Sequence, residues 1–221
     1  MQRIKDDFIK TLTRFVPLTG KMVLEVGCGT GYYSEQIARE CKGLTAIDPD
    51  RSMLSIARCL DIPNALFFDR SAVATRFTSG RFDATVATLS FHHIERSLMP
   101  QALDEAVRVT HPAGRIVAFE PATRGSFFEA EILFDACDGD ERKAKDDALR
   151  ALHSHPRLRS LISLGDQTVF KFDDVEDFKR SMAPRVPGRT LKNTDRLEGF
   201  LRAHDYTLMA SRSIEIFSIR A

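Results

Sequence analysis

Apolar residues follow two different patterns along this chain. Short continuous apolar runs, typical of buried strands, recur at residues 22–26, 44–47, 65–68, 82–89 and 115–119. Between these runs the apolar positions fall three to four residues apart, as on the buried face of an amphipathic helix. Strands that alternate with helices predict an α/β fold built on an open parallel sheet.

The two ends of the chain add further elements to this pattern. A leading amphipathic helix, which Pro17 ends, is expected from a stripe of four apolar residues: Ile4, Phe8, Leu12 and Phe15. Helical spacing recurs in three later segments: residues 127–159, interrupted by Gly139, residues 173–182 and residues 194–203. Short apolar runs that suit strands stand at residues 168–172, 206–210 and 214–219.

Composition and charge exclude several classes of protein. The 221 residues suit one large domain, or one domain with a lid. With 32 basic and 31 acidic residues the net charge is +1, so no global basic field attracts nucleic acid or an anionic membrane. No apolar stretch is long enough to span a bilayer. The cysteines form no CxxC pair and are expected to be reduced thiols of a cytoplasmic protein: Cys28, Cys41, Cys59 and Cys137.

Three glycines at alternate positions, Gly27, Gly29 and Gly31, follow the apolar run at residues 22–26. Glycine accepts positive φ and has no Cβ to keep the backbone away from a ligand. A helix that begins behind such a turn adds free N–H groups and a partial positive charge. The glycines would also suit a plain turn, but the later elements favour a corner that binds a nucleotide-like ligand.

Asp48 ends the second apolar run, about 20 residues beyond the first glycine, where acidic residues of nucleotide-binding folds bind ribose. A carboxylate has two acceptor oxygens, which match the two neighbouring hydroxyls of a ribose. The alternative role is to cap the following helix, but Asp50 is better placed to do so. We therefore expect Asp48 to bind a ribose.

The glycine spacing separates two kinds of cofactor. Dinucleotide folds carry GxGxxG, whereas this chain has GxGxG, and Tyr32 stands where the last glycine should be. NAD is therefore disfavoured. Glu25, two residues before Gly27, together with GxGxG resembles motif I of the class I S-adenosylmethionine-dependent methyltransferases. The resemblance extends over residues 22–121.

Two further segments resemble the UbiE-like small-molecule group, methyltransferase type 11. The first is the strand at residues 82–89 with the pair His92 and His93, and the second is the helix, Pro-Gly turn and strand that lead to Glu120. The resemblance implies a Rossmann-like, doubly wound, seven-stranded sheet with an antiparallel last strand. Strands six and seven would be a hairpin formed by the last two apolar runs.

The resemblance also implies a division of the chain into domains. Residues 1–123 and 193–221 would bind the cofactor, and residues 124–192 would form an inserted helical cap that selects the substrate. In this family a leading helix often helps to close the cofactor pocket. The alternative is a helix that packs on the edge of the sheet, and the sequence does not separate the two.

S-adenosylmethionine is the cofactor that the resemblance implies. Its methionine end would meet Glu25 and the glycine-loop amides, which belong to Gly27, Cys28, Gly29 and Gly31. Its adenine amine would donate to Asp69, and the backbone N–H of Arg70 would meet a ring nitrogen. Asp69 also suits the start of a turn. Met53 would lie against the adenine or serve as a core residue.

His92 and His93 follow the fourth strand, and open parallel sheets bind ligands beyond the carboxyl ends of their strands. Because imidazole titrates near neutral pH, one of them is a candidate general base. Otherwise the pair shapes the pocket. The segment lacks the Asn/Asp-Pro-Pro-Tyr/Phe motif of enzymes that methylate DNA bases, which argues against that substrate.

Two clusters outside these motifs are candidates for an anionic substrate. They are the pair His153 and His155, and the group Arg185, Arg189, Lys192 and Arg196. Both also suit an ordinary protein surface. Nothing in the spacing of Cys137 and the two histidines marks a metal site, so no metal is expected.

The sequence therefore predicts S-adenosylmethionine-dependent methyl transfer to a small molecule by direct displacement. The neutral net charge disfavours nucleic acid as a partner, and an RNA or protein substrate stays open as an alternative. A catalytically silent protein that binds the cofactor is one alternative, and a nicotinamide dehydrogenase is the other. The acceptor atom and the oligomeric state cannot be derived from the residues.

Overall fold

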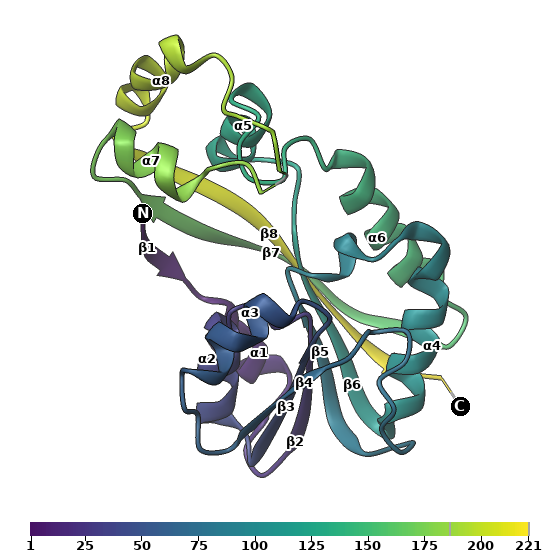
Figure 1. Cartoon of the computed structure of the whole chain (residues 1–221). Helices are drawn as coiled ribbons and strands as arrows, with labels where there is room; N and C mark the ends of the chain where they lie inside the picture. Colours follow the sequence, from purple (N-terminus) through teal and green to yellow (C-terminus); the bar gives the residue numbers. More distant parts are fainter. Residues whose placement is uncertain (186, 221) are drawn as a thin grey trace. The chain divides into compact units, whose positions relative to one another are not determined.

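The chain folds into two compact units (Figure 1), and the computed structural model describes residues 1–185 and 187–220. The sheet unit comprises Phe8–Glu120, Asp146–Leu164 and Ser213–Ala221, and the small unit comprises Met1–Asp7, Pro121–Lys145 and Gly165–Arg212. These units differ in extent from the division expected at residues 124 and 192. Residues 146–164 belong to the sheet unit, and residues 1–7, 121–123 and 193–212 belong to the small unit. Whether residues 124–192 select the substrate stays a prediction.

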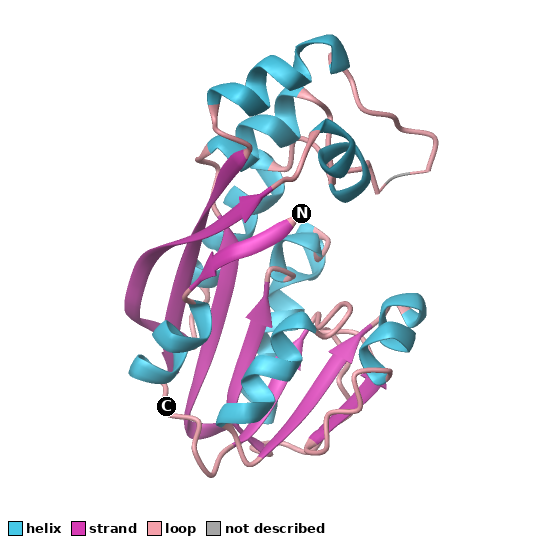
Figure 2. Cartoon of the chain, turned by 90° about the vertical axis from the view of Figure 1, so that its left-hand side faces the viewer, coloured by secondary structure: helices cyan, strands magenta, loops and turns pink. Residues whose placement is uncertain are grey.

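Parallel strands form the centre of the sheet unit, as the apolar runs predict. The strands β2 to β6 pair in parallel, in the spatial order β6-β5-β2-β3-β4. Their bounds are β2 (Met22–Val26), β3 (Gly43–Asp48), β4 (Ala65–Asp69), β5 (Phe82–Thr88) and β6 (Thr110–Pro121). Two long strands extend the order to β7-β8-β6-β5-β2-β3-β4, namely β7 (Leu158–Lys171) and β8 (Thr207–Ile219). The last strand, β8, runs antiparallel to β6 (Figures 1 and 2). The fold is α/β and doubly wound, as expected.

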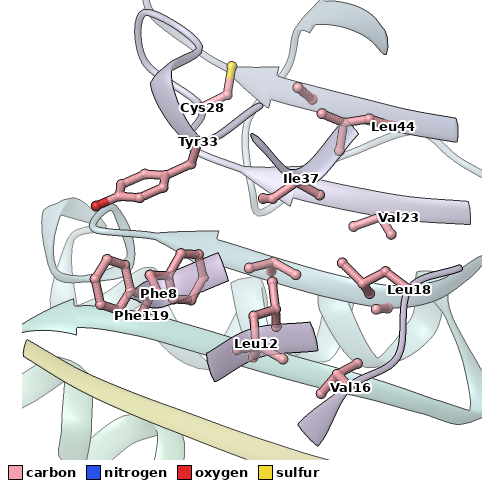
Figure 3. Close-up of a cluster of buried hydrophobic side chains, with 14 of the residues drawn as sticks. Phe8, Leu12, Val16, Leu18, Val23, Cys28, Tyr33, Ile37, Leu44 and Phe119 are labelled. Atoms are coloured by element: carbon pink, nitrogen blue, oxygen red, sulfur yellow. The ribbon is translucent and has the colours of Figure 1, made fainter. Parts of the chain in front are cut away.

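Three helices cover one face of this sheet: α1 (Phe8–Phe15), α2 (Tyr32–Glu40) and α3 (Arg51–Arg58). Their apolar side chains join strand residues in one buried cluster, in which Phe8 stacks on Phe119 of β6 at a ring separation of 4.1 Å (Figure 3). Leu12 is fully buried in the same cluster. The leading helix therefore packs on the sheet.

The opposite face of the sheet carries α4 (Met99–Val109) and α6 (Arg142–Ser154). Successive strand residues point to opposite faces. Ile116 and Ala118 therefore pack in a second cluster with Leu103 and Leu152, although their neighbours in β6 belong to the first. Leu98, just before α4, lies in a short 3-10 turn, η2 (Arg96–Leu98), and is 38% exposed.

The leading helix is shorter than its apolar stripe predicts. Residues 2–6 form a strand, β1 (Gln2–Asp6), whose Gln2 lies opposite Lys171 at the end of β7 in antiparallel register. Ile4 belongs to this strand and is 53% exposed. Gln2, Arg3, Lys5 and Asp6 pair with β7, with a register shift at Ile4, so the first apolar position of the stripe is not part of the helix.

The expected hairpin at the end of the chain is wrong. Residues 207–219 form one continuous strand, β8, which lies between β7 and β6 in the sheet. The polar residues 211–213 suggested a turn, but they include no Gly, Pro, Asn or Asp to supply the backbone angles of a tight turn. With β1 included, the sheet has eight strands instead of seven.

The small unit is mainly helical. It contains α5 (Ser126–Leu133), α7 (Val175–Ser181), the 3-10 turn η3 (Thr194–Arg196) and α8 (Leu197–Ala203). Their apolar faces share a core with Phe134 and Phe172. Within the described part of the chain, no helix combines the length and the apolar character that crossing a membrane requires.

Candidate functional site

The glycine turn after β2 needs glycine at each of its three positions, because all three have positive φ, 70° at Gly27, 53° at Gly29 and 86° at Gly31. A Cβ on Gly27 would lie 2.2 Å from the Cβ of Ser90, and a Cβ on Gly31 would lie 2.7 Å from a methyl of Leu60. A Cβ on Gly29 would meet nothing within 4 Å. Two glycines therefore permit close packing, and the third leaves open space.

Asp48 ends β3 and is 8% exposed. One carboxylate oxygen accepts the N–H of Gly29 at 2.8 Å, and the other accepts the N–H of Asp50 at 2.9 Å. A carboxylate has about four acceptor positions, so these two bonds leave acceptor capacity for a ligand. Asp50 is the cap of α3, since its side chain accepts the N–H groups of Ser52 and Met53.

Glu25 lies in the middle of the sheet and is fully buried. Its oxygens accept the hydroxyls of Ser34 on α2 at 2.5 Å and Thr88 on β5 at 2.8 Å. Burial raises the pKa of Glu25 to about 7. The two hydroxyl hydrogen bonds lower this pKa, and the nearby charge of Asp48 raises it further. Glu25 thus joins the start of the glycine turn to two neighbouring elements.

A cleft of about 310 Å³ opens beyond the carboxyl ends of the parallel strands. Its wall includes six residues that offer polar groups or backbone: Gly27, Asp48, Arg70, Ser90, His93 and Glu95. Each lies at or after the end of a strand, which is where open α/β sheets bind ligands. The volume falls at the lower end of the range for small-molecule sites, about 300–1,000 Å³.

The two histidines that follow β5 have different positions. His93 is exposed and lines the cleft. His92 is 5% exposed, and its Nδ1 lies 2.5 Å from a carboxylate oxygen of Glu120 at the end of β6. Because a carboxylate can only accept, Nδ1–H of His92 donates. Of the two candidate bases, His93 is the one in the cleft wall.

The residues expected at the adenine are only partly brought together. Arg70 lines the cleft, donates to the carbonyl of Thr75 at 2.6 Å, and has its guanidinium 4.2 Å from the ring centre of Phe77. Asp69 is exposed and accepts from Arg51. Neither Asp69 nor Met53 is among the residues that line the cleft.

Cys28 lies within the glycine turn and is buried. Burial, followed by the charges of Glu25 and Asp48, raises the pKa of its thiol. Its backbone N–H donates to the carbonyl of Ile47 at 3.1 Å, beside the N–H of Gly27, which donates to the same oxygen at 2.8 Å. The amides of this part of the turn therefore bind β3.

Ser90, Glu95 and Glu120 were not predicted as site residues. Ser90 donates to the carbonyl of Val26 at 2.6 Å and fills the space that the missing side chain of Gly27 leaves. Its position directly after β5 was the signal that could have identified it. Glu120 stands at the corresponding end of β6, where its position is equally informative.

The two basic clusters make ion pairs within the protein. His153 bonds Glu215 at 3.0 Å, and His155 lies 3.2 Å from Asp104. In the small unit, ion pairs join Arg189 and Lys192 to Asp135, and Arg185 to Asp138. The histidines and three of the four basic residues expected there are thus engaged by carboxylates.

Comparison with known proteins finds similarity to methyltransferases in the segment that contains this site. The family model of the methyltransferase domain matches residues 23–114, which include the glycine turn, Asp48 and both histidines. The malonyl-[acyl-carrier protein] O-methyltransferase of Pectobacterium atrosepticum is 27% identical over 124 residues, which cover 56% of this chain and 47% of that protein. The ubiquinone biosynthesis O-methyltransferase of Xylella fastidiosa is 30% identical over 110 residues, which cover 48% and 44% respectively.

The matched segment thus spans about half the length of these relatives. Among solved structures, a SAM-dependent methyltransferase of Aquifex aeolicus aligns with a TM-score of 0.56 and 15% identity, over 92% of this chain and 87% of that chain. Identity this low shows the fold. Residues 23–114 thus match a methyltransferase domain, and the chain shares the fold of a solved S-adenosylmethionine-dependent methyltransferase.

Proposed function

We propose that this protein transfers the methyl group of S-adenosylmethionine to a small molecule bound in the cleft at the strand ends. The observation that carries the proposal is the position of Asp48. Its carboxylate lines the cleft, is held by two backbone amides, and retains acceptor capacity. Such a carboxylate suits the two hydroxyls of a ribose.

The remaining cleft residues fit the cofactor as well. Gly29 leaves open space on the turn, so the backbone can approach a ligand closely. The turn leads into α2, whose first N–H groups carry partial positive charge toward a carboxylate such as that of the methionine end. Arg70, which lines the cleft beside the expected adenine position, packs its guanidinium against the rings of Phe68 and Phe77.

When bound, S-adenosylmethionine supplies a methyl carbon on a sulfonium, which leaves as a neutral thioether after displacement. The contribution of the chain is mainly orientation and the exclusion of water. His93 is placed to accept a hydrogen bond or a proton from an acceptor in the cleft. His92, buried against Glu120, serves to position this turn in our proposal.

Both relatives named above are O-methyltransferases. We therefore propose an oxygen acceptor as the first class to test. Selection of the acceptor is assigned to residues 124–192, on the resemblance to related enzymes. The two alternatives, a silent binding protein and a nicotinamide dehydrogenase, have no support from the comparisons.

Transfer of a labelled methyl group tests the proposal. The purified protein is incubated with methyl-labelled S-adenosylmethionine and a fractionated extract of hydroxylated and carboxylated metabolites, and products are followed by mass spectrometry. We expect a labelled product with the wild type and none with Asp48→Ala. Cofactor binding without any labelled product in all fractions would favour the silent binding protein.

A further inference from the structure

Glu120 is a buried carboxylate, 1% exposed, that no motif assigns to the site. One of its oxygens accepts the backbone N–H groups of Ser90 at 3.2 Å and Phe91 at 2.9 Å. The other accepts the backbone N–H of His92 at 3.2 Å and the ring Nδ1–H at 2.5 Å. Four donors from three consecutive residues therefore converge on one side chain.

The glutamate side chain is well matched to these donors. Removing a carboxylate from water is costly unless its oxygens receive several hydrogen bonds, and bonds to an ionised acceptor are about twice as strong as neutral ones. Glutamine would turn an NH₂ group toward N–H donors and would leave part of the set without an acceptor. Aspartate would keep the charge but is one methylene shorter.

The turn that Glu120 binds forms part of the cleft wall. It comprises Ser90 and the 3-10 turn η1 (Phe91–His93), and both Ser90 and His93 line the cleft. Ser90 in turn contacts β2 through the carbonyl of Val26 and occupies the space above Gly27. The rings of His92 and His93 lie 4.0 Å apart, so the anchored ring supports the exposed one.

We propose that Glu120 is the positioning residue of this cleft. Its carboxylate fixes residues 90–93 and holds His92 with the proton on Nδ1, which sets Ser90 against the glycine turn and directs His93 toward the acceptor. The consequence for methyl transfer rests on the proposed function. The consequence for the turn itself does not.

The test compares Glu120→Gln with a matched control, Glu215→Gln. Glu215 is also buried in the sheet unit, 3% exposed, and accepts the hydroxyls of Ser163 and Ser213 and the ring of His153. It does not touch residues 90–93. Both variants lose one buried charge, so a general loss of stability should affect both.

Calorimetry with S-adenosylhomocysteine is the first readout. We expect Glu120→Gln to weaken S-adenosylhomocysteine binding about 10-fold or more, because a small displacement of the cleft wall moves the residues that would contact the ligand. Glu215→Gln should bind within about 2-fold of the wild type. Glu120→Asp, which retains the charge and is the more conservative change, should fall between the two. Equal affinities of Glu120→Gln and Glu215→Gln would overturn the positioning role.

The ring proton of His92 provides a second readout that needs no ligand. In the wild type a strongly downfield, exchange-protected Nδ1–H signal is expected in the proton NMR spectrum, and it should move upfield in Glu120→Gln and stay unchanged in Glu215→Gln. An identical signal in both variants would contradict the inference. If the wild type does not bind S-adenosylhomocysteine while this signal behaves as expected, the proposed function fails and the turn assignment stands.

Discussion

The acidic residues at the cleft of the sheet unit have different partners from several acidic residues of the small unit. In the sheet unit, Asp48 and Glu120 accept backbone N–H groups, and Glu25 accepts two hydroxyls. In the small unit, Asp135 pairs with Arg189 and Lys192. Asp48, Glu25 and Glu120 are thus held by neutral groups, whereas Asp135 is neutralised by cations.

Three further carboxylates of the small unit also pair with cations. Asp177 binds the terminal amine of Met1 at 2.5 Å, and the buried Lys145 lies 3.6 Å from both Glu131 and Glu141. When a carboxylate is paired with a cation, its negative charge is already compensated within the protein. One that is held by amides keeps its charge for a ligand. This difference supports the proposal that the ligand binds at the strand ends.

The largest effect is expected from closing the space between β2 and β5. Gly27→Ala should abolish S-adenosylhomocysteine binding and lower the free energy of unfolding by about 3 kcal/mol or more, because its Cβ would clash with Ser90 at positive φ. Gly29→Ala should lower the free energy of unfolding by only about 1 kcal/mol, because its Cβ would meet no atom and only the positive φ is unfavourable. Urea denaturation and calorimetry measure both. Equal losses in the two variants would show that steric closure is not the cause.

Asp48→Ala should weaken S-adenosylhomocysteine binding about 100-fold, which corresponds to the loss of two hydrogen bonds to a charged acceptor. The control is Asp50→Ala, which removes the cap of α3 and leaves Asp48 in place. It should lower the midpoint of thermal unfolding modestly and change the affinity less than 3-fold, roughly. Similar affinities in Asp48→Ala and the wild type would remove Asp48 from the site.

The buried Glu25 should make stability depend on pH. Its pKa rises from 4.5 to about 7 on folding, so the folded state binds the proton more tightly. That stabilisation is complete below pH 4.5 and is lost as pH rises through about 7. Between pH 5 and 8 the wild type should lose about 2 kcal/mol relative to Glu25→Gln. Parallel pH profiles of the two proteins, measured by urea denaturation, would refute this assignment.

The smallest effect is expected in the small unit. Asp135→Asn removes the carboxylate that pairs with both Arg189 and Lys192. These ion pairs are partly exposed and contribute little to the free energy of unfolding. We expect an unchanged affinity for S-adenosylhomocysteine and a slight fall in the midpoint of thermal unfolding. An affinity loss as large as that of Asp48→Ala would break the contrast between the units.

Features that depend on neighbouring residues could be predicted from the sequence, whereas features that depend on distant pairing could not. The parallel strands, the glycine turn and Asp48 follow from local patterns, because each is coded by neighbouring residues. The hairpin at residues 206–219 was wrong, since only pairing with the distant β7 decides that the polar residues 211–213 remain extended. Likewise β1 forms because of its partner in β7, and no local pattern announces that pairing.

Within the site, the sequence predicted which residues stand at the strand ends. It did not predict which of them line the cleft and which are buried behind it. His92 and His93 are adjacent and chemically identical, yet Glu120, 28 residues beyond His92, draws one ring into the core. Asp69 was expected at the adenine, but its carboxylate accepts from Arg51 and lies outside the cleft lining. Such pairings depend on tertiary structure.

The most direct test of this account is a calorimetric titration of the purified protein with S-adenosylhomocysteine, with NADH as the control. The account predicts binding of S-adenosylhomocysteine at one site per chain and no heat from NADH. Failure of S-adenosylhomocysteine to bind, or NADH binding that survives competition by it, would contradict the central claim that the cleft beyond β2 and β3 binds a methyl donor.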